Sequence, residues 1–421
     1  LLDNFGFYNF FEGTKAENGE TYKPIFTARY PDAYRFFLEM GSLKNSNGVN
    51  YYNGKGKIYN EILKNDTYNE YWKSRNIRTH LKNIKPAVLV VGGWYDAEDL
   101  FGALETYASI EKQSPQNKNH LVMGPWTHGG WAAQKWTSFA SQDFVSNLND
   151  YYHDSIETPF FNHFLKGKGT FYLPEATVYE TGSNQWKQYP VWPPADAKDV
   201  SYFFQANGKL ATASSGGSNL FTEYISDPAH PVPYTGIISP RRNNEYMAED
   251  QRFSSQRPDV ISFVTDSLTE DVTVTGQIVA RLSVSMTGTD ADFIVKLIDV
   301  LPDWEPNPAS NPKNYQLGGM QRLVRAEVFR GKFRNSYEKP EALKPNAVEK
   351  VNVPLNAVAH TFRKGHRIMV QVQNSWFPLV DRNPQQFMKI PNAEPSDYKK
   401  ATIQIYHDAV NQSQIVLPVM K

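Results

Sequence analysis

Two short apolar runs in the first third of the chain are each followed directly by glycine. They occupy residues 87–91 and 121–123 and consist mainly of valine and leucine. Short apolar runs bounded in this way are typical of buried parallel strands. Between them, residues 98–111 place leucine, tyrosine and alanine on one helical face. The pattern predicts a strand, a helix and a second strand, which is the repeating unit of an α/β sheet.

One ionisable residue stands just beyond each predicted strand. Asp96 follows the first strand and His128 follows the second, at a separation of 128 − 96 = 32 residues, enough for one helix and one strand. Ligands of open α/β sheets bind at the carboxyl ends of the strands, so we expect both side chains at one crevice. A lone loop histidine is more often held by backbone groups, but the two residues together fit a base with its orienting acid.

The sequences around both residues resemble known hydrolase motifs. Residues 93–96 read Gly-Trp-Tyr-Asp, and residues 124–128 read Gly-Pro-Trp-Thr-His. They are similar to the acid and histidine motifs of the α/β-hydrolase family that includes X-Pro dipeptidyl peptidases, cocaine esterase, glutaryl-7-aminocephalosporanic-acid acylases and α-amino acid ester hydrolases. The resemblance implies a triad in the chain order nucleophile, acid, histidine. His128 would be the general base, and Asp96 would orient its imidazole.

The motif for a seryl nucleophile is missing from the sequence. No Gly-x-Ser-x-Gly occurs, although this strained turn carries the nucleophile in the resembling fold. In the resembling family the nucleophile precedes both the acid and a helical cap, so we expect it before Leu1. The start without methionine also looks like a cut inside a longer protein. We therefore expect an N-terminal part of the same protein to supply the nucleophile, and the chain alone to be inactive.

Two further carboxylates follow Asp96, at Glu98 and Asp99. Acidic residues in the first turn of a helix commonly cap exposed N–H groups and interact with the helix dipole, and this interpretation stays open for either residue. In the resembling family, α-amino acid ester hydrolases have acidic residues at these two places, and cocaine esterase lacks the pair. The resemblance implies that Glu98 and Asp99 bind a substrate ammonium group, together with a third carboxylate upstream.

Residues 1–83 are rich in aromatic side chains, with a cluster at residues 5–11, and are mostly helical in pattern. We predict helices at residues 31–38, where a proline lies in the first turn, and at 68–72 and 78–81. The resemblance implies that this region is a helical cap over the active site. Most of its aromatic residues are expected to serve packing alone.

Residues 84–185 are expected to complete the C-terminal half of the α/β-hydrolase domain. A helix predicted at residues 151–165 ends this part, and Pro159 either kinks it or marks where its regular portion begins.

Residues 186–421 show short strands broken by turn residues, which predict an all-β jelly-roll domain. Residues 362–367 and 375–384 look like the signature of the jelly roll in the same family. No flexible linker precedes this domain, so we expect it to be integral and not a separate carbohydrate-binding module. The clearest predicted strands are residues 278–284, 293–300, 322–329, 348–354, 367–372 and 402–406.

Composition narrows the function classes. A chain of 421 residues is too long for a single hydrophobic core, so more than one domain is expected. Its 44 basic residues balance 44 acidic ones, so no net charge favours binding to nucleic acid or to an anionic membrane. No apolar stretch reaches the length of a membrane span. With no cysteine, disulfides and thiolate chemistry are excluded, and the nine histidines include no His-x-x-x-His pair. We expect neither a metal nor another cofactor.

We expect a serine hydrolase that forms an acyl-enzyme and acts on small esters or amides with an α-amino acyl group. One alternative is a glutaryl-type acylase or cocaine-esterase-like hydrolase of the same family. A second alternative is a non-catalytic binding protein on the same fold, against which Asp96 and His128 both argue. By resemblance alone, a periplasmic or secreted bacterial protein is expected. Ester versus amide preference and oligomeric state, including a homo-oligomer, stay open.

Overall fold

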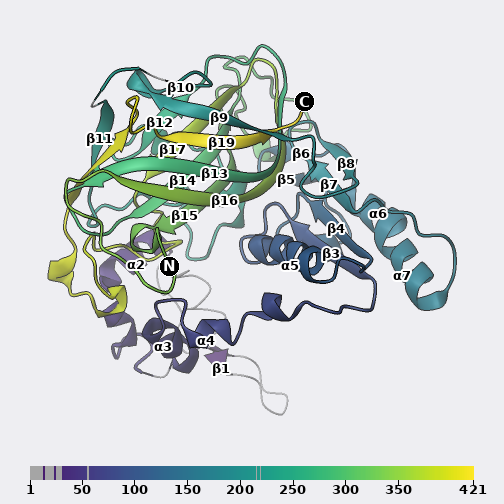
Figure 1. Cartoon of the computed structure of the whole chain (residues 1–421), viewed down its shortest axis with the longest axis horizontal. Helices are drawn as coiled ribbons and strands as arrows, with labels where there is room; N and C mark the ends of the chain where they lie inside the picture. Colours follow the sequence, from purple (N-terminus) through teal and green to yellow (C-terminus); the bar gives the residue numbers. More distant parts are fainter. Residues whose placement is uncertain (1–12, 15–22, 25–30, 55, 215, 219) are drawn as a thin grey trace.

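The computed structural model consists of three parts: a helical segment, a small α/β unit and a large β domain (Figure 1). In this view α2 and α3 lie beneath the β domain, and the α/β unit with α5, α6 and α7 lies to its lower right. The aromatic cluster at residues 5–11 lies outside the described residues. The structure describes residues 13–14, 23–24, 31–54, 56–214, 216–218 and 220–421.

Short helices make up the first part. The helix α2 (Ala33–Met40) begins at Asp32, whose carboxylate accepts hydrogen bonds from two backbone N–H groups of the first turn. Pro31 therefore precedes the N-cap, and the prediction that it lies within the first turn is wrong. Two predicted helices correspond to α4 and η3, whereas α3 was not predicted. These elements are η2 (Leu43–Asn47), α3 (Lys57–Lys64), α4 (Glu70–Lys73) and η3 (Ile77–His80).

The α/β unit contains a four-stranded sheet of its own. Its first three strands are parallel, and the fourth is antiparallel to the third. The helix α5 (Leu100–Gln113) connects the first two strands and packs Leu104 and Tyr107 into their shared core. The predicted strand–helix–strand unit is therefore confirmed. In sheet order, the strands are β3 (Val88–Gly93), β4 (Asn119–Gly124), β7 (Ala176–Glu180) and β8 (Gln185–Tyr189).

A helical stretch between β4 and β7 has three successive geometries. It runs as α6 (Leu148–Tyr152), a π-helical turn η5 (His153–Glu157) and α7 (Thr158–Lys166). Pro159 lies at the start of α7, so it marks where the last regular helix begins. In the described part of the chain, no helix combines the length and apolar character that a membrane span requires. Small elements nearby are η4 (Gly130–Ala132), β5 (Ser138–Phe139) and β6 (Gln142–Asp143).

The β domain is one sheet of eleven strands that encloses a large apolar core. All six strands predicted here are present, and β13 and β16 pair along most of their length. Five others were not predicted: β9, β10, β11, β12 and β19. The strands are β9 (Lys198–Gln205), β10 (Lys209–Ala211), β11 (Phe221–Ser226), β12 (Ile261–Val264), β13 (Val272–Met286), β14 (Asp292–Val300), β15 (Gln321–Arg330), β16 (Glu349–Phe362), β17 (Arg367–Gln373), β18 (Ala401–Tyr406) and β19 (Gln414–Val419).

Short helical turns connect these strands, and one isolated two-stranded pair lies near the start of the chain. The turns are η6 (Ala206–Gly208), η7 (Asn244–Ala248), α8 (Arg252–Ser255), η8 (Pro312–Asn314), η9 (Gly331–Phe333), η10 (Ile390–Asn392) and η11 (Pro395–Asp397). The pair is formed by β1 (Gly13–Thr14) and β2 (Lys23–Pro24).

The β domain and the α/β unit are joined by buried backbone contacts. The N–H of Thr181 donates to the carbonyl of Ala359 at 3.0 Å, and the N–H of Thr361 donates back to Thr181 at 2.8 Å. Ala359 also belongs to the apolar core formed by β3, β4 and α5. In addition, the guanidinium of Arg325 donates to the carbonyl of Trp94 at 2.9 Å. The two parts therefore share one interior.

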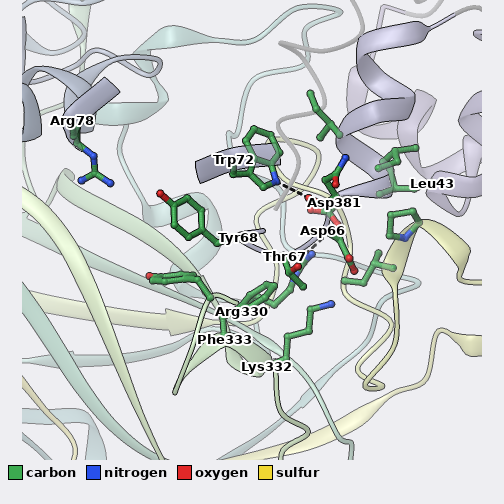
Figure 2. Close-up of a pocket in the computed structure, with 16 residues that line it drawn as sticks. Leu43, Asp66, Thr67, Tyr68, Trp72, Arg78, Arg330, Lys332, Phe333 and Asp381 are labelled. Atoms are coloured by element: carbon green, nitrogen blue, oxygen red, sulfur yellow. Dashed lines mark hydrogen bonds and ion pairs between the residues drawn. The ribbon is translucent and has the colours of Figure 1, made fainter. Parts of the chain in front are cut away.

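A cavity of about 430 Å³ separates the helical segment from the β domain. Figure 2 shows that its walls come from both parts, with Arg330 and Lys332 on the β side. Arg330 donates to Asp292 at 2.7 and 2.9 Å and to Asp381 at 3.1 Å. The ammonium of Lys332 donates to the carbonyl of Met388 at 3.0 Å. Because both buried cations already have hydrogen-bond partners, we interpret this cavity as a gap in the packing between the two parts and not as a binding site.

Candidate active site

Glycines bring the ends of β3 and β4 close together. A Cβ on Gly93 would lie 2.2 Å from the carbonyl oxygen of Trp126, and one on Gly124 would lie 2.4 Å from the Trp126 ring. The N–H of Tyr95 then donates to that same carbonyl at 3.0 Å. Since no larger residue fits, the two glycines fix the paths by which the chain leaves both strands. These paths carry Asp96 and His128 to one place.

Asp96 is buried at 2% exposure and uses both of its carboxylate oxygens. Its Oδ1 accepts hydrogen bonds from the backbone N–H groups of Glu98 at 2.8 Å and Asp99 at 3.0 Å. Its Oδ2 lies 3.1 Å from Nδ1 of His128. The carboxylate therefore holds the turn that begins α5 and orients the imidazole at the same time. The sequence-based pairing of Asp96 with His128 matches this geometry.

His128 follows β4, and its side chain is half exposed. Partial burial lowers the pKa of its imidazole, but the hydrogen bond to Asp96 and the charges of Asp96, Glu98 and Asp99 more than offset this, so the pKa is raised. The Trp131 ring lies edge-on to the imidazole of His128, with the two ring centroids 6.3 Å apart. A carboxylate at Nδ1 leaves Nε2 as the nitrogen that can accept a proton from a substrate or nucleophile.

The two carboxylates that follow Asp96 have different surroundings. Glu98 forms an ion pair with Arg242, which comes from the β domain 144 residues away. Asp99 occupies the N-cap position of α5 but makes no capping hydrogen bond with its side chain. Its Oδ2 lies 3.4 Å from Nδ1 of His128, and its side chain is 67% exposed. The side chain of Asp99 therefore does not fill the capping role considered for it, and Asp96 bonds the two backbone N–H groups just before the helix.

Asp96, Asp99 and His128 bring their ligand atoms within 4.8 Å of one another. Such a triangle is geometrically close enough for a metal ion. However, Oδ1 of Asp96 is already shared by two N–H groups, and Nδ1 of His128 faces carboxylates instead of presenting a lone pair to an ion. The donor set fits acid–base chemistry, and we do not assign a metal to it.

A cavity of about 250 Å³ lies beside the turn that carries the acid. Ala97 and Glu98 form one wall, and the β domain forms the other, where Arg325 and Trp376 are both buried. Sequence reasoning found neither Arg242 nor Arg325, because nothing local distinguishes an arginine that reaches across from another part of the chain.

Comparisons with known proteins agree with this arrangement. Residues 28–130 match the family model described as X-Pro dipeptidyl-peptidase (S15 family). Residues 171–416, more than half of the chain, match the model described as X-Pro dipeptidyl-peptidase C-terminal non-catalytic domain. The chain belongs to the X-Pro dipeptidyl-peptidase family. The family expected from the motifs around Asp96 and His128 is therefore confirmed.

Proteins that are similar to this chain in sequence include named esterases. Cocaine esterase from Rhodococcus sp. (strain MB1 Bresler) is 27% identical over 378 residues, which cover 86% of this chain and 62% of that protein. A putative serine esterase from Mycobacterium bovis is 23% identical over 80% of this chain and 50% of its own length. The chain thus spans less than two thirds of these relatives.

Solved structures of similar proteins match nearly the whole chain. An aminopeptidase from the marine sediment archaeon Thaumarchaeota archaeon has a TM-score of 0.90 and 33% identity, covering 99% of this chain and 67% of that one. An α-amino acid ester hydrolase has a TM-score of 0.90 and 32% identity, covering 99% of this chain and 69% of that one. These neighbours have the same α/β and β-rich parts.

Proposed function

We propose that this chain is the acid-and-base-bearing part of a serine hydrolase that acts on esters or amides with an α-amino acyl group. One observation carries the proposal: a buried carboxylate and a histidine, 3.1 Å apart, at the ends of two neighbouring parallel strands. Hydrolase relatives support the reaction class. In this proposal, the described residues before residue 84 belong to a helical cap, residues 84–185 form the C-terminal part of an α/β-hydrolase domain, and residues 186–421 form a jelly roll.

The proposed mechanism uses a seryl nucleophile from an N-terminal part of the same protein. Nε2 of His128 accepts the seryl proton as the hydroxyl attacks the carbonyl carbon, and then returns it to the leaving alcohol or amine. Asp96 holds the proton of His128 on Nδ1 and stabilises the imidazolium that forms. Water then attacks the acyl-enzyme with His128 again as base, which releases the carboxylic acid and restores the serine.

The α-amino preference is proposed for Glu98 and Asp99. An ammonium group about 4 Å from one carboxylate gains up to about 4 kcal/mol at an effective dielectric near 20, before desolvation is subtracted. Arg242 offsets the charge of Glu98, so Asp99 is the stronger candidate of the two. After desolvation, a net gain of about 1 to 3 kcal/mol corresponds to roughly ten- to a hundredfold discrimination.

The test compares kcat/KM for a phenylglycine methyl ester and its des-amino analogue in the nucleophile-bearing enzyme. We expect the wild type to prefer the amino ester by roughly ten- to a hundredfold and Glu98→Gln plus Asp99→Asn to lose that preference. Arg242→Gln is the matched control, because it frees Glu98 and should strengthen the preference. A preference that survives the double substitution would contradict the assigned role of the pair.

An acylase with an anionic acyl group is the second candidate, and one observation favours it. Nε of Arg325 is buried beside the 250 Å³ cavity and, among the described residues, has no hydrogen-bond partner. A buried guanidinium N–H is a donor that suits a carboxylate. Hydrolysis of a glutaryl amide in preference to the amino ester, abolished by Arg325→Met, would place this candidate first.

A further inference from the structure

Two carboxylates face one nitrogen in the candidate active site. Nδ1 of His128 lies 3.1 Å from Oδ2 of Asp96 and 3.4 Å from Oδ2 of Asp99. A neutral imidazole that donates from Nδ1 has one proton there, so the two oxygens compete for it. Asp96 is the nearer acceptor and has the better geometry.

Asp99 is suited to serve as a reserve acceptor. It stands at the N-cap of α5, but its side chain makes no capping hydrogen bond to the first turn of the helix. Glu98, its neighbour, instead pairs with Arg242. The side chain of Asp99 therefore keeps its position beside His128 without a competing bond to the helix.

We propose that Asp99 is a positioning residue, a second carboxylate that keeps the proton of His128 on Nδ1 when Asp96 cannot. Its effect on catalysis rests on the proposed hydrolase function, whereas its effect on the imidazole does not. The Nδ1–H tautomer leaves Nε2 free to act as the base, so holding this tautomer matters more to the reaction than charge alone.

The charged groups around His128 decide how this can be measured. Asp96, Glu98 and Asp99 approach from the turn between β3 and α5, and Arg242 approaches Glu98 from the β domain. Both Glu98 and Asp99 raise the pKa of His128 through their charge, so a titration shift would not separate them. The tautomer of His128 does distinguish Asp99 from Glu98, because only a carboxylate in direct contact with Nδ1 can hold the proton there.

The experiment reads the tautomer of His128 by ¹⁵N NMR of the 421-residue chain above its titration range, with His128→Gln to assign the signals. In Asp96→Asn, we expect the Nδ1–H tautomer to persist. In Asp96→Asn plus Asp99→Asn, we expect a switch to Nε2–H. The matched control, Asp96→Asn plus Glu98→Gln, should keep Nδ1–H. A switch already in Asp96→Asn, no switch in the double variant, or a switch in the control would overturn the proposal.

Activity gives a second readout in the nucleophile-bearing enzyme. With p-nitrophenyl acetate, which has no amino group, Asp96→Asn should stay at least about tenfold more active than Asp96→Asn plus Asp99→Asn, because losing the orienting acid entirely costs a triad roughly 10⁴-fold. Equal activities would overturn the catalytic consequence. If the wild type had no activity, only the hydrolase proposal would be contradicted. The tautomer of His128 is measured by NMR without any substrate being hydrolysed.

Discussion

The single carboxylate of Asp96 contacts both the backbone and the candidate base. One oxygen holds the turn that begins α5, and the other holds the imidazole of His128. The motif Gly-Trp-Tyr-Asp indicated the second role, and only the structure assigned the first. The ion pair between Glu98 and Arg242 had no sequence signal, because it joins residues 144 positions apart in different parts of the molecule.

The buried Lys296 makes the stability of the protein depend on pH. Its side chain is fully buried, its ammonium donates to Oε1 of Gln251 at 2.9 Å, and burial lowers its pKa from 10.5 to about 7. Between these two values the unfolded chain binds more protons than the folded one, so the free energy of unfolding should rise with pH. The slope approaches about 1.4 kcal/mol per pH unit at most.

Urea unfolding of the wild type and Lys296→Met at pH 7, 8 and 9 checks this expectation. The wild type should gain stability across the range, and the variant should show a flatter dependence because it cannot titrate there. A parallel dependence in both proteins would mean that Lys296 is not its source.

At the scale of single elements, two aspartates at N-caps offer a matched comparison. Asp32 accepts two backbone hydrogen bonds at the start of α2, whereas Asp99 accepts none at the start of α5. We expect Asp32→Ala to lower the free energy of unfolding by about 1 kcal/mol, the usual value of a side-chain cap. Asp99→Ala should cost clearly less. Chemical unfolding measures both, and equal losses would contradict the capping assignment.

The strands divide into those that sequence patterns can reveal and those that they cannot. The isolated apolar runs of β3 and β4 end in glycine, and both were predicted. β19 (Gln414–Val419) was not, because it lies between β13 and β9 within the sheet, is buried along most of its length and shows no alternation. It even contains a proline, which sequence reasoning takes as evidence against a central strand. Its assignment depends on partners distant in sequence.

For the whole molecule, Gly182 tests how tightly the α/β unit and the β domain fit. Its φ is +83°, and a Cβ there would lie 2.1 Å from the carbonyl oxygen of Thr361 across the interface. Gly167 also has a positive φ, +61°, but nothing lies within 4 Å of its Cβ position. Gly167→Ala should cost about 1 to 2 kcal/mol from backbone strain alone.

Gly182→Ala should cost more than Gly167→Ala by at least about 1 to 3 kcal/mol, because it adds a steric clash at a buried interface. Thermal and urea unfolding of both variants give the comparison. If the two substitutions were equally costly, the interface would have to yield easily at Thr361, against the close backbone pairing of Thr181 with Ala359.

The backbone pairing across this interface bears on how such proteins can be recombined. Consider a chimera that exchanges the β domain between two relatives at the loop before β9. In it, Trp94 and Thr181 would no longer have their native partners in the β domain. Arg325, Ala359 and Thr361 would all come from the new donor. Because Trp94 lies two positions before Asp96, a mismatch there would reach the acid directly. Crossover points in this family are therefore better chosen from shared contacts than from domain boundaries.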